Sequence, residues 1–359
     1  MHTTGGGTND AQRLHDYRRV LLLLLPGLGD ALSCSPLVRS LRDHRPGWRL
    51  DALTMLAPVR EYANELGVFE AVRHLPLLSM SPLGAAVSLC RRRDQRYDYV
   101  ILPYPAGRWQ YHAVAQLVKA RDRVTHRYPS LGLRFLRAVM RTKAVALCGG
   151  SRVRENLNLL PLLGVSPGGE ELGYLIPASW LAGGERSGIG IHAGTMVYKG
   201  NEARRWPLER FRELIARLPT SEPISIVSGP NEREEARYLL RSAPRGARLI
   251  EGTLREVALE ISRCRLLIAN DSGIAHLGSG LGVTTLILYG MTRPERALPP
   301  RNAVAVRPST CPPCFDEYAP RFSCARSLDF RCIREDLEVA HVLRAVRDAF
   351  AAAQPQAPT

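Results

Sequence analysis

The order of apolar and polar positions predicts buried strands that alternate with helices. Residues 20–25 form an unbroken apolar run, which is followed by glycines and then by apolar positions at helical spacing up to residue 44. A short apolar run bounded by breakers is typical of a parallel strand, because helices cover both faces of a parallel sheet. Residues 48–55 and 98–104 are mostly apolar and predict two further buried strands. The alternation predicts a doubly wound, parallel α/β sheet.

The same pattern starts again in the second half of the chain. Strand-like segments there end in IHAG, IVSG, IEGT, IAND and LYG, and helical segments separate them. Residues 166–184 are rich in Gly, Pro and Ser and predict a linker. We therefore expect two Rossmann-like domains with a ligand-binding cleft between them, at the carboxyl ends of their strands. The predicted ranges are a flexible tail (1–18), a first domain (19–178), a second domain (185–335) and a C-terminal helix (336–353).

The composition indicates a folded protein with an anionic partner. With 45% hydrophobic and 23% charged residues among 359, disorder as the main state is excluded. Lys+Arg exceeds Asp+Glu by 49 − 34 = 15. Nearly all of these cations are Arg, which suits bidentate phosphate recognition, although an Arg-rich composition alone would give the same charge. No basic segment is interleaved with aromatic residues, so nucleic acid is not an expected partner.

The sequence also bears on the compartment. The apolar run at residues 20–25 is far shorter than the roughly 20 residues that cross a bilayer. No small-residue cleavage site follows it, so a buried strand is favoured over a signal peptide. We expect a cytoplasmic protein.

Asp30 is the first candidate for chemistry. It follows the turn Pro26-Gly27-Leu28-Gly29, at the start of a predicted helix. Glycines let the chain turn tightly and let a ligand approach closely. The turn lacks the third glycine of a dinucleotide fingerprint, so a dinucleotide site is poorly supported. The Asp30 carboxylate would serve either as a general base or only as a helix cap.

Two further turns predict an anion site. The segment from Asn270 to Gly273 precedes a helix of small residues, whose free N–H groups attract phosphate, and His276 lies one turn further on. The turn from His192 to Thr195 leads into a basic loop before Trp206-Pro207. The cations of this loop are Lys199, Arg204 and Arg205. The alternatives are an ordinary helix cap, a core or surface histidine and a solvated loop.

Four cysteines gather near the C-terminus with the spacing C-x2-C-x9-C-x7-C. They are Cys311, Cys314, Cys324 and Cys332. Four thiolates this close fit a tetrahedral zinc or iron site, and a metal would stabilise a loop with few core-forming residues. We expect the site to be structural and to lie outside the donor elements. A redox-active CPPC motif and unlinked thiols are the alternatives.

Taken together, these motifs resemble glycosyltransferase family 9, the ADP-heptose:lipopolysaccharide heptosyltransferases. The matching segments are GLGDALSCSPLVRSLR, RENLNLLPLLG, HAGT with RRWPLERFRELIARL, and EGTLREVALEISRCRLLIANDSGIAHLGSGLGVTTLILYG. They occur in this order between about residue 20 and residue 341. The resemblance implies the GT-B architecture, with an N-terminal acceptor domain, a C-terminal nucleotide-sugar domain and the active site between them.

The resemblance also implies residue roles. Asp30 matches the proposed general base of the family, and Thr195 matches a ligand of the donor phosphate. Arg204 stands where the family often has Lys, and Lys199 is a second cation of the same loop. The D-[ST]-G-x-x-H element that lines the donor corresponds to Asp271, Ser272, Gly273 and His276. Arg293 departs from the family pattern, which commonly has Asp at this position near the donor sugar.

The expected function is inverting transfer of a heptose-type sugar from a nucleotide diphosphate donor, ADP-heptose, to a lipopolysaccharide core or related glycan. The chain contains no Asp-x-Asp pair, so no cofactor is expected for catalysis, only a structural Zn or Fe at the cysteines. Basic groups at residues 91–93 and at Arg121, Arg123 and Arg127 predict a glycolipid or glycan acceptor and peripheral contact with the inner membrane. Two alternatives stay open: an autotransporter-type protein heptosyltransferase, whose branch holds iron in such a cysteine group, and a non-catalytic nucleotide-sugar-binding protein.

Overall fold

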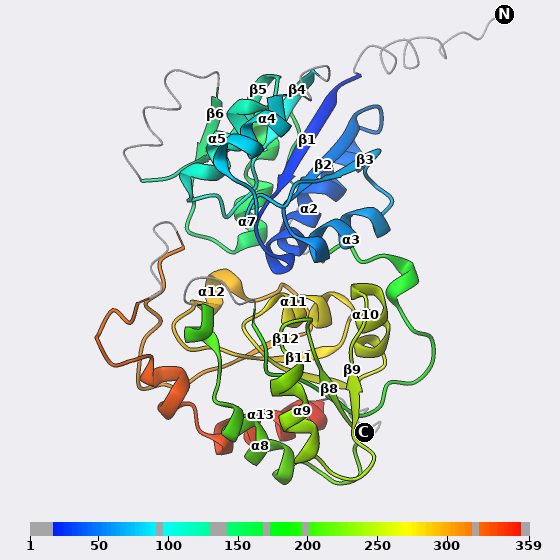
Figure 1. Cartoon of the computed structure of the whole chain (residues 1–359), viewed down its shortest axis with the longest axis vertical. Coiled ribbons are helices and arrows are strands. Elements are labelled where there is room, and N and C mark those ends of the chain that lie inside the picture. The colour runs from blue at the N-terminus through cyan, green and yellow to red at the C-terminus, as the bar shows by residue number, and fades with distance from the viewer. Residues whose placement is uncertain are drawn as a thin grey trace, which may run out of the picture. The chain divides into compact units, whose positions relative to one another are not determined.

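The computed structural model describes residues 17–90, 96–129, 142–167, 173–195, 201–317 and 323–352. The chain divides into two compact units, Met1–Leu175 and Ile176–Thr359 (Figure 1). Almost all of the predicted tail, as well as Lys199 and the basic residues 91–93, lie outside the described residues. Among the described residues, no helix is both long enough and apolar enough to cross a bilayer.

Unit 1 is built on a parallel six-stranded sheet with the order β3-β2-β1-β4-β5-β6. Its strands are β1 (Arg19–Leu24), β2 (Arg49–Thr54), β3 (Ala71–His74), β4 (Tyr97–Ile101), β5 (Ala120–Arg127) and β6 (Thr142–Ala146). Its helices are α2 (Leu28–His44), α3 (Ala57–Glu65), α4 (Pro82–Cys90), α5 (Trp109–Leu117), α7 (Arg152–Leu157) and the 3₁₀ helix η1 (Leu160–Leu163). Leu22 on β1 pairs with Ala52 on one side and Ile101 on the other. All three side chains are fully buried, as an unbroken apolar run in a parallel strand requires.

Residues 152–163 form two short helices, not one long helix. α7 ends at Leu157, and η1 begins at Leu160 with Pro161 in its first turn. Proline has no N–H to continue the hydrogen-bond ladder of α7, which is why the helix stops. Gly164 then closes η1 in the left-handed region, with φ 68°.

Unit 2 repeats the architecture with a second parallel sheet, in the order β12-β11-β10-β7-β8-β9. Its strands are β7 (Ile189–His192), β8 (Ile224–Val227), β9 (Arg248–Ile250), β10 (Leu266–Asn270), β11 (Thr284–Leu288) and β12 (Ala303–Val306). Its longer helices are α8 (Leu208–Arg217), α9 (Arg233–Arg241), α10 (Leu254–Ser262), α11 (Gly273–Gly280) and α13 (Val339–Ala352). Its short helices are η2 (Ala178–Trp180), η3 (Asn201–Arg204), α12 (Pro294–Ala297) and η4 (Cys332–Asp336). The prediction of two doubly wound α/β units is confirmed.

The core of unit 2 shows why these segments are helical. α8 buries Phe211, Leu214 and Ile215, which share one face at helical spacing. The ring of Trp206 lies edge-on to Phe211, with 4.9 Å between the ring centroids. α13 packs against α8 and against β11 and β12 through its own apolar face (Figure 1). This packing fixes the Trp206 segment, which leads into the candidate site.

Candidate functional site

In both sheets the predicted site residues follow strands that lie at the reversal of the strand order. In each unit the first strand lies between the second and the fourth, so the winding direction reverses beside it. The reversal lies between β1 and β4 in unit 1, and between β7 and β10 in unit 2. Ligands of doubly wound sheets bind at the carboxyl ends of the strands at this reversal. The Asp30 turn follows β1, and the two predicted anion turns follow β7 and β10.

Asp30 is the third residue of α2 and is held on both oxygens. The N–H of Gly27 donates to its Oδ2 at 3.2 Å, and Nη1 of Arg152 lies 3.4 Å from its Oδ1. The Arg152 side chain is only 9% exposed, whereas that of Asp30 is 21% exposed. Asp30 therefore does cap the helix, and its partly exposed, fixed carboxylate can also meet a ligand.

Buried hydrogen bonds hold the Asp30 turn against α7. Asn156 on α7 is fully buried, and its Nδ2 donates to the carbonyl of Ser33 at 3.3 Å. Its Oδ1 accepts from the N–H of Tyr104, beyond β4, at 2.8 Å. The hydroxyl of Tyr174 lies 3.2 Å from that of Ser33. Burial raises the pKa of Tyr174 well above the usual range. Sequence reasoning missed Arg152 and Asn156, although Asn156 lies in the quoted RENLNLLPLLG segment.

In unit 2 a buried amide joins the two turns. Asn270, the last residue of β10, is fully buried. Its Nδ2 donates to the carbonyl of Ala193 at 2.6 Å, and its Oδ1 accepts from the N–H of Trp206 at 3.0 Å. The end of β10, the turn after β7 and the RRWP segment thus meet at one point, as the motifs predicted.

Ser272 begins α11. It is the N-cap residue, and its Oγ accepts from the N–H of Ala275 at 3.4 Å. Gly273 follows as the first helical residue, so the first N–H groups of α11 lack carbonyl partners within the helix. His276 lies one turn further on and is buried, with 2% of its surface exposed. The turn is therefore a helix cap, and its geometry is also that of a phosphate-binding helix start.

The two arginines before Trp206 have different partners. Nη1 of Arg204 lies 3.5 Å from Oδ2 of Asp271, and its guanidinium stacks 4.8 Å from the ring centroid of Phe315. Arg205 instead reaches Thr195, with Nε donating to Oγ1 at 3.1 Å and Nη2 donating to the carbonyl at 3.0 Å. Predicted donor residues of the two turns are thus joined in pairs, Arg204 with Asp271 and Arg205 with Thr195.

Sequence reasoning also missed His192 and Glu232 as site residues. Nε2 of His192 lies 3.1 Å from Oε2 of Glu232, and Nδ1 of His192 lies 3.2 Å from Oγ of Ser272. Burial alone would raise the pKa of Glu232. The His192 ring, hydrogen bonds from His192 and Gly229, and the charge of Arg205 together hold it below the ordinary value. The signal that could have revealed this contact is the adjacency of β7 and β8, because Glu232 follows β8 as His192 ends β7.

Residues 178–321 match the sequence profile of glycosyltransferase family 9 (heptosyltransferase). This range contains the turns after β7 and β10 and the RRWP segment. Unit 2 carries a family 9 glycosyltransferase domain.

Solved structures resemble nearly the whole chain. The family 9 glycosyl transferase from Veillonella parvula superposes with a TM-score of 0.74 at 19% identity, over 94% of this chain and 98% of that one. E. coli heptosyltransferase WaaC with ADP-2-deoxy-2-fluoro heptose gives 0.69 at 17% identity, over 92% and 99%. The iron-containing dodecameric TibC from enterotoxigenic E. coli gives 0.58 at 14% identity, over 94% and 77%. No curated protein sequence matches the chain. The chain is a glycosyltransferase with the GT-B fold.

The late cysteines of this glycosyltransferase do not show the expected metal geometry. Within the described ranges, no three or more His, Cys, Asp or Glu side chains are grouped so that they could hold a metal. The other three thiols still influence Cys332. Burial, followed by the charge of Cys311 and smaller effects of Cys314 and Cys324, raises the pKa of Cys332 to about 11. The side-chain arrangement therefore does not fit a Cys₄ metal centre, and that centre stays a prediction from spacing.

The cysteine segment is not separate from the donor elements, contrary to expectation. The N–H groups of Cys314 and Phe315 both donate to the carbonyl of Met291, at 3.0 and 2.9 Å. These bonds hold the Phe315 ring against Arg204. A Cβ on Gly290, beyond β11, would lie only 3.3 Å from Sγ of Cys332. The segment thus packs directly against the end of β11 and against a predicted donor residue.

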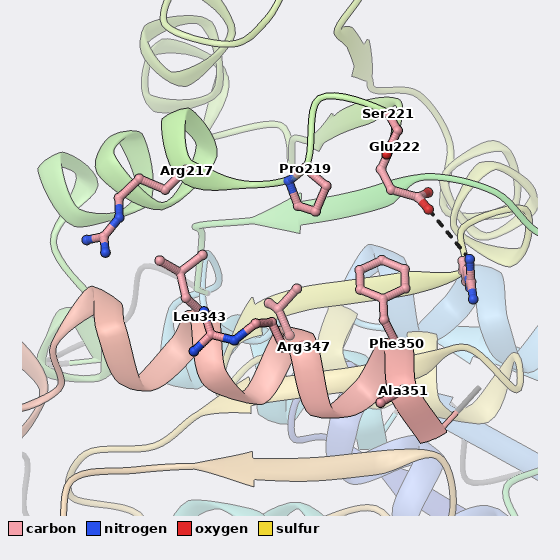
Figure 2. A pocket seen from close by; sticks show the side chains of 10 residues that line it. Arg217, Pro219, Ser221, Glu222, Leu343, Arg347, Phe350 and Ala351 are labelled. Atoms are coloured by element: carbon pink, nitrogen blue, oxygen red, sulfur yellow. Dashed lines mark ion pairs between the residues drawn. The ribbon is translucent and has the colours of Figure 1, made fainter. Parts of the chain in front are cut away.

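A surface pocket of about 670 Å³ lies elsewhere in unit 2. Its wall comes from the end of α8, from Ser221 and Glu222 before β8, from Arg265 before β10, and from α13 (Figure 2). Oε1 of Glu222 lies 3.5 Å from Nη1 of Arg265. A dashed line marks the ion pair of Glu222 in Figure 2. The pocket therefore lies at the amino ends of the strands, opposite the edge where doubly wound sheets bind ligands.

The predicted basic face of unit 1 is smaller than expected. Arg123 is half-buried, and its guanidinium donates to the carbonyls of Ala115, Gln116 and Val118. It caps the end of α5, so it is not part of a surface for anions. Arg121 and Arg127 are exposed.

Proposed function

We propose that this glycosyltransferase is an inverting heptosyltransferase that uses ADP-heptose and a lipopolysaccharide core or related glycan. The observation that carries the proposal is the position of Asp30 and of the two unit-2 turns at the strand-order reversals. The family profile supports the heptosyl chemistry, because its matched range includes both turns of unit 2. The solved WaaC structure, which contains an ADP-heptose analogue, supports an ADP-linked donor.

We propose that unit 2 binds the donor through its diphosphate. The first N–H groups of α11 and the hydroxyl of Ser272 would hold the phosphate oxygens, with Gly273 allowing close approach. Further donor contacts are assigned to Thr195, Lys199, Arg204, Asp271 and His276. Arg204 would turn from Asp271 toward the diphosphate, a stronger anion, and the Asp271 carboxylate would then contact the sugar. Lys199 lies outside the described residues, so its assignment follows only from its place in the basic loop of the sequence.

Asp30 is the proposed general base. It takes the proton of the acceptor hydroxyl as that oxygen bonds to the anomeric carbon from the face opposite the diphosphate. The bond from the anomeric carbon to the phosphate oxygen breaks, its electron pair leaves with ADP, and the configuration inverts. Arg152 keeps the carboxylate in place for this step.

Charge on the departing ADP would be neutralised by the helix amides and cations of unit 2. The chain has no Asp-x-Asp pair to bind a metal-diphosphate complex, so we propose that transfer needs no cofactor. Arg293, an exposed N-cap of α12, stands where the family commonly has Asp, so the donor's sugar is a separate question for experiment.

We propose that unit 1 binds the acceptor and makes a peripheral contact with the cytoplasmic face of the inner membrane. Exposed apolar side chains, Leu83 on α4 and Trp109 on α5, support this contact, being 75% and 60% exposed. Exposed Arg121 and Arg127 would attract anionic headgroups.

The test is transfer followed by mass spectrometry. The purified enzyme is mixed with ADP-heptose and a series of lipopolysaccharides truncated before, within and after the inner core. The expected result is one added heptose on one truncation form and none with UDP-glucose. ADP-heptose hydrolysis or no mass gain on any glycan would contradict the proposal.

A protein acceptor is the second candidate, because the autotransporter-type branch that the sequence resembles holds iron, and an iron-containing glycosyltransferase, TibC, resembles the chain in structure. Adding an autotransporter passenger domain to the same assay separates the two: heptose on the polypeptide, with none on the glycans, favours it. A non-catalytic nucleotide-sugar-binding protein would bind ADP and transfer nothing; a fixed, partly exposed Asp30 argues against it.

A further inference from the structure

Three polar side chains form a hydrogen-bonded row in unit 2, and the proposed mechanism uses only the first of them, Ser272. Oγ of Ser272 lies 3.2 Å from Nδ1 of His192, and Nε2 of His192 lies 3.1 Å from Oε2 of Glu232. Ser272 begins α11, His192 ends β7 and Glu232 is the N-cap residue of α9. The row therefore links the candidate phosphate turn to two neighbouring strands of the sheet. The side chains of His192 and Glu232 are only 3% and 12% exposed.

The surrounding backbone leaves room for the Glu232 carboxylate. A Cβ on Gly194 would lie 2.0 Å from its Cδ and Oε1, and one on Gly229 would lie 2.8 Å from Oε2. The N–H of Gly229 also donates to Oε2 at 2.9 Å. The carboxylate can occupy this position because both neighbours are glycine.

The row fixes which ring nitrogen of His192 carries a proton. The pKa of Glu232 is held low against its burial, so its side chain is a carboxylate that only accepts. Nε2 of His192 must therefore carry the proton that it donates to Glu232. Nδ1 then has two states: it accepts the hydroxyl proton of Ser272 when the ring is neutral, or it donates to Ser272 when the ring is an imidazolium.

These two states present Ser272 differently to a ligand. In both, Oγ accepts from the N–H of Ala275. With a neutral ring, the hydroxyl proton points to His192. With an imidazolium, Oγ accepts from Nδ1 as well, and its own proton becomes available to a third group. A diphosphate oxygen at the start of α11 is the acceptor that such a proton suits.

We propose that His192 takes up a proton when the donor diphosphate binds, and that Glu232 and His192 are positioning residues that turn the Ser272 hydroxyl toward the phosphate. The proton comes from solvent, adds to Nδ1 and returns to solvent when ADP leaves, and no covalent bond to carbon changes. This inference rests on the proposed donor site.

Some neighbouring charges favour protonation of His192, and others oppose it. Glu232 and the incoming diphosphate favour the imidazolium. Arg205, which lies near Glu232 and contacts Glu235, opposes it, as does Arg204 beside Asp271 in the next turn. In the proposed donor site Arg204 turns to the diphosphate, but its single charge balances only part of the negative charge that the diphosphate brings, and Arg205 stays with Glu235. Proton uptake is the expected response.

Calorimetry of ADP binding tests the proposal. Titrations at pH 7.5 in buffers of different ionisation enthalpy give the number of protons taken up. His192→Asn keeps an amide N–H near the place of Nδ1 but does not titrate. Free ADP is the same in both titrations, so wild type minus variant gives the proton uptake that depends on His192. We expect wild type to take up more protons, by a substantial fraction of one, and to gain affinity more steeply as the pH falls toward 6.

Glu232→Gln should weaken ADP binding about tenfold and reduce the uptake, because an amide stabilises the imidazolium less than a carboxylate does. The exposed Glu234 of α9 offers a matched control, since Glu234→Gln should change neither quantity. Equal uptake in wild type and His192→Asn would overturn the inference while leaving the donor site intact. No ADP binding by wild type would overturn both.

A spectrum of the unaltered enzyme gives an answer that does not depend on variants folding. Two-bond ¹H–¹⁵N correlation of ¹⁵N-histidine protein distinguishes the ring forms. One of the nine histidines should change from the Nε2–H form to the doubly protonated form when ADP is added. If every ring keeps its form, the proposal is wrong.

Discussion

The two units share one strand order but place opposite charges at the point where it reverses. Beyond β1 in unit 1, a carboxylate stands at the helix start, and Arg152 holds it. Beyond β7 and β10 in unit 2, helix amides, Ser272 and two arginines gather instead. The strand order selects where a ligand binds, and the few residues after each strand select the chemistry. In this account unit 1 handles a proton, and unit 2 handles an anion.

The largest expected effect is at the proposed general base of unit 1. Asp30→Asn should lower kcat at least about a hundredfold, the usual scale for a lost general base, because the amide cannot take the acceptor proton. Steady-state transfer rates with ADP-heptose measure it. Asp43→Asn, on the exposed end of the same helix, is the matched control and should keep wild-type turnover. Near wild-type turnover in Asp30→Asn would show that Asp30 is not the general base.

On the anion side, Gly194→Ala should cost about 1–3 kcal/mol in stability, the usual range for overpacking, since its Cβ would meet the Glu232 carboxylate at 2.0 Å. Thermal unfolding and ADP affinity should both decline. Gly183→Ala is the control, because a Cβ there has nothing within 4 Å. If the two alanine variants behave alike, the Glu232 position matters less than the geometry indicates.

Arg204→Ala should weaken ADP binding about tenfold, or about 1.4 kcal/mol, through the loss of one cation at the diphosphate. Direct calorimetric binding measures it, with the exposed Arg237→Ala of α9 as control. An unchanged affinity would mean that Arg204 serves only Asp271 and Phe315.

For each cation removed, a smaller effect is expected at the membrane. Arg121→Glu with Arg127→Glu should reduce binding to anionic vesicles by about 1 kcal/mol for each cation removed. Sedimentation with vesicles of phosphatidylglycerol and phosphatidylethanolamine measures it, and Arg237→Glu in unit 2 should bind as wild type does. Equal binding by all three proteins would show that the charges of unit 1 do not contact lipid.

The smallest expected effect is that of metal removal. EDTA should leave transfer within about twofold of the untreated rate, because the proposed donor site neutralises ADP with protein groups. Loss of activity that Mg²⁺ or Mn²⁺ restores would contradict this. Metal analysis of the same preparation tests the separate Cys₄ prediction. Stoichiometric Zn or Fe would support that prediction, and the absence of both metals would refute it.

Much of the fold follows from the sequence, because unbroken apolar runs such as residues 20–25 are typical of buried parallel strands. β3 and β5 are harder to predict. The sequence of β5 is ARDRVTHR, and its charged residues interrupt the apolar pattern that would indicate a buried strand. The turn residues could be placed, since glycines and caps are local signals. The partners Arg152 and Glu232 could not, because each meets its site only through strand order and helix packing. The same reason explains Arg123, whose carbonyl partners lie at the end of a preceding helix.

ADP affinity of Asp30→Asn tests the division between the two units most directly. Calorimetry should give the wild-type dissociation constant for this variant, which scarcely turns over, while Ser272→Ala in unit 2 binds ADP more weakly. That pair of results would assign the proton to unit 1 and the anion to unit 2. Weakened ADP binding in Asp30→Asn, with Ser272→Ala unchanged, would contradict the account.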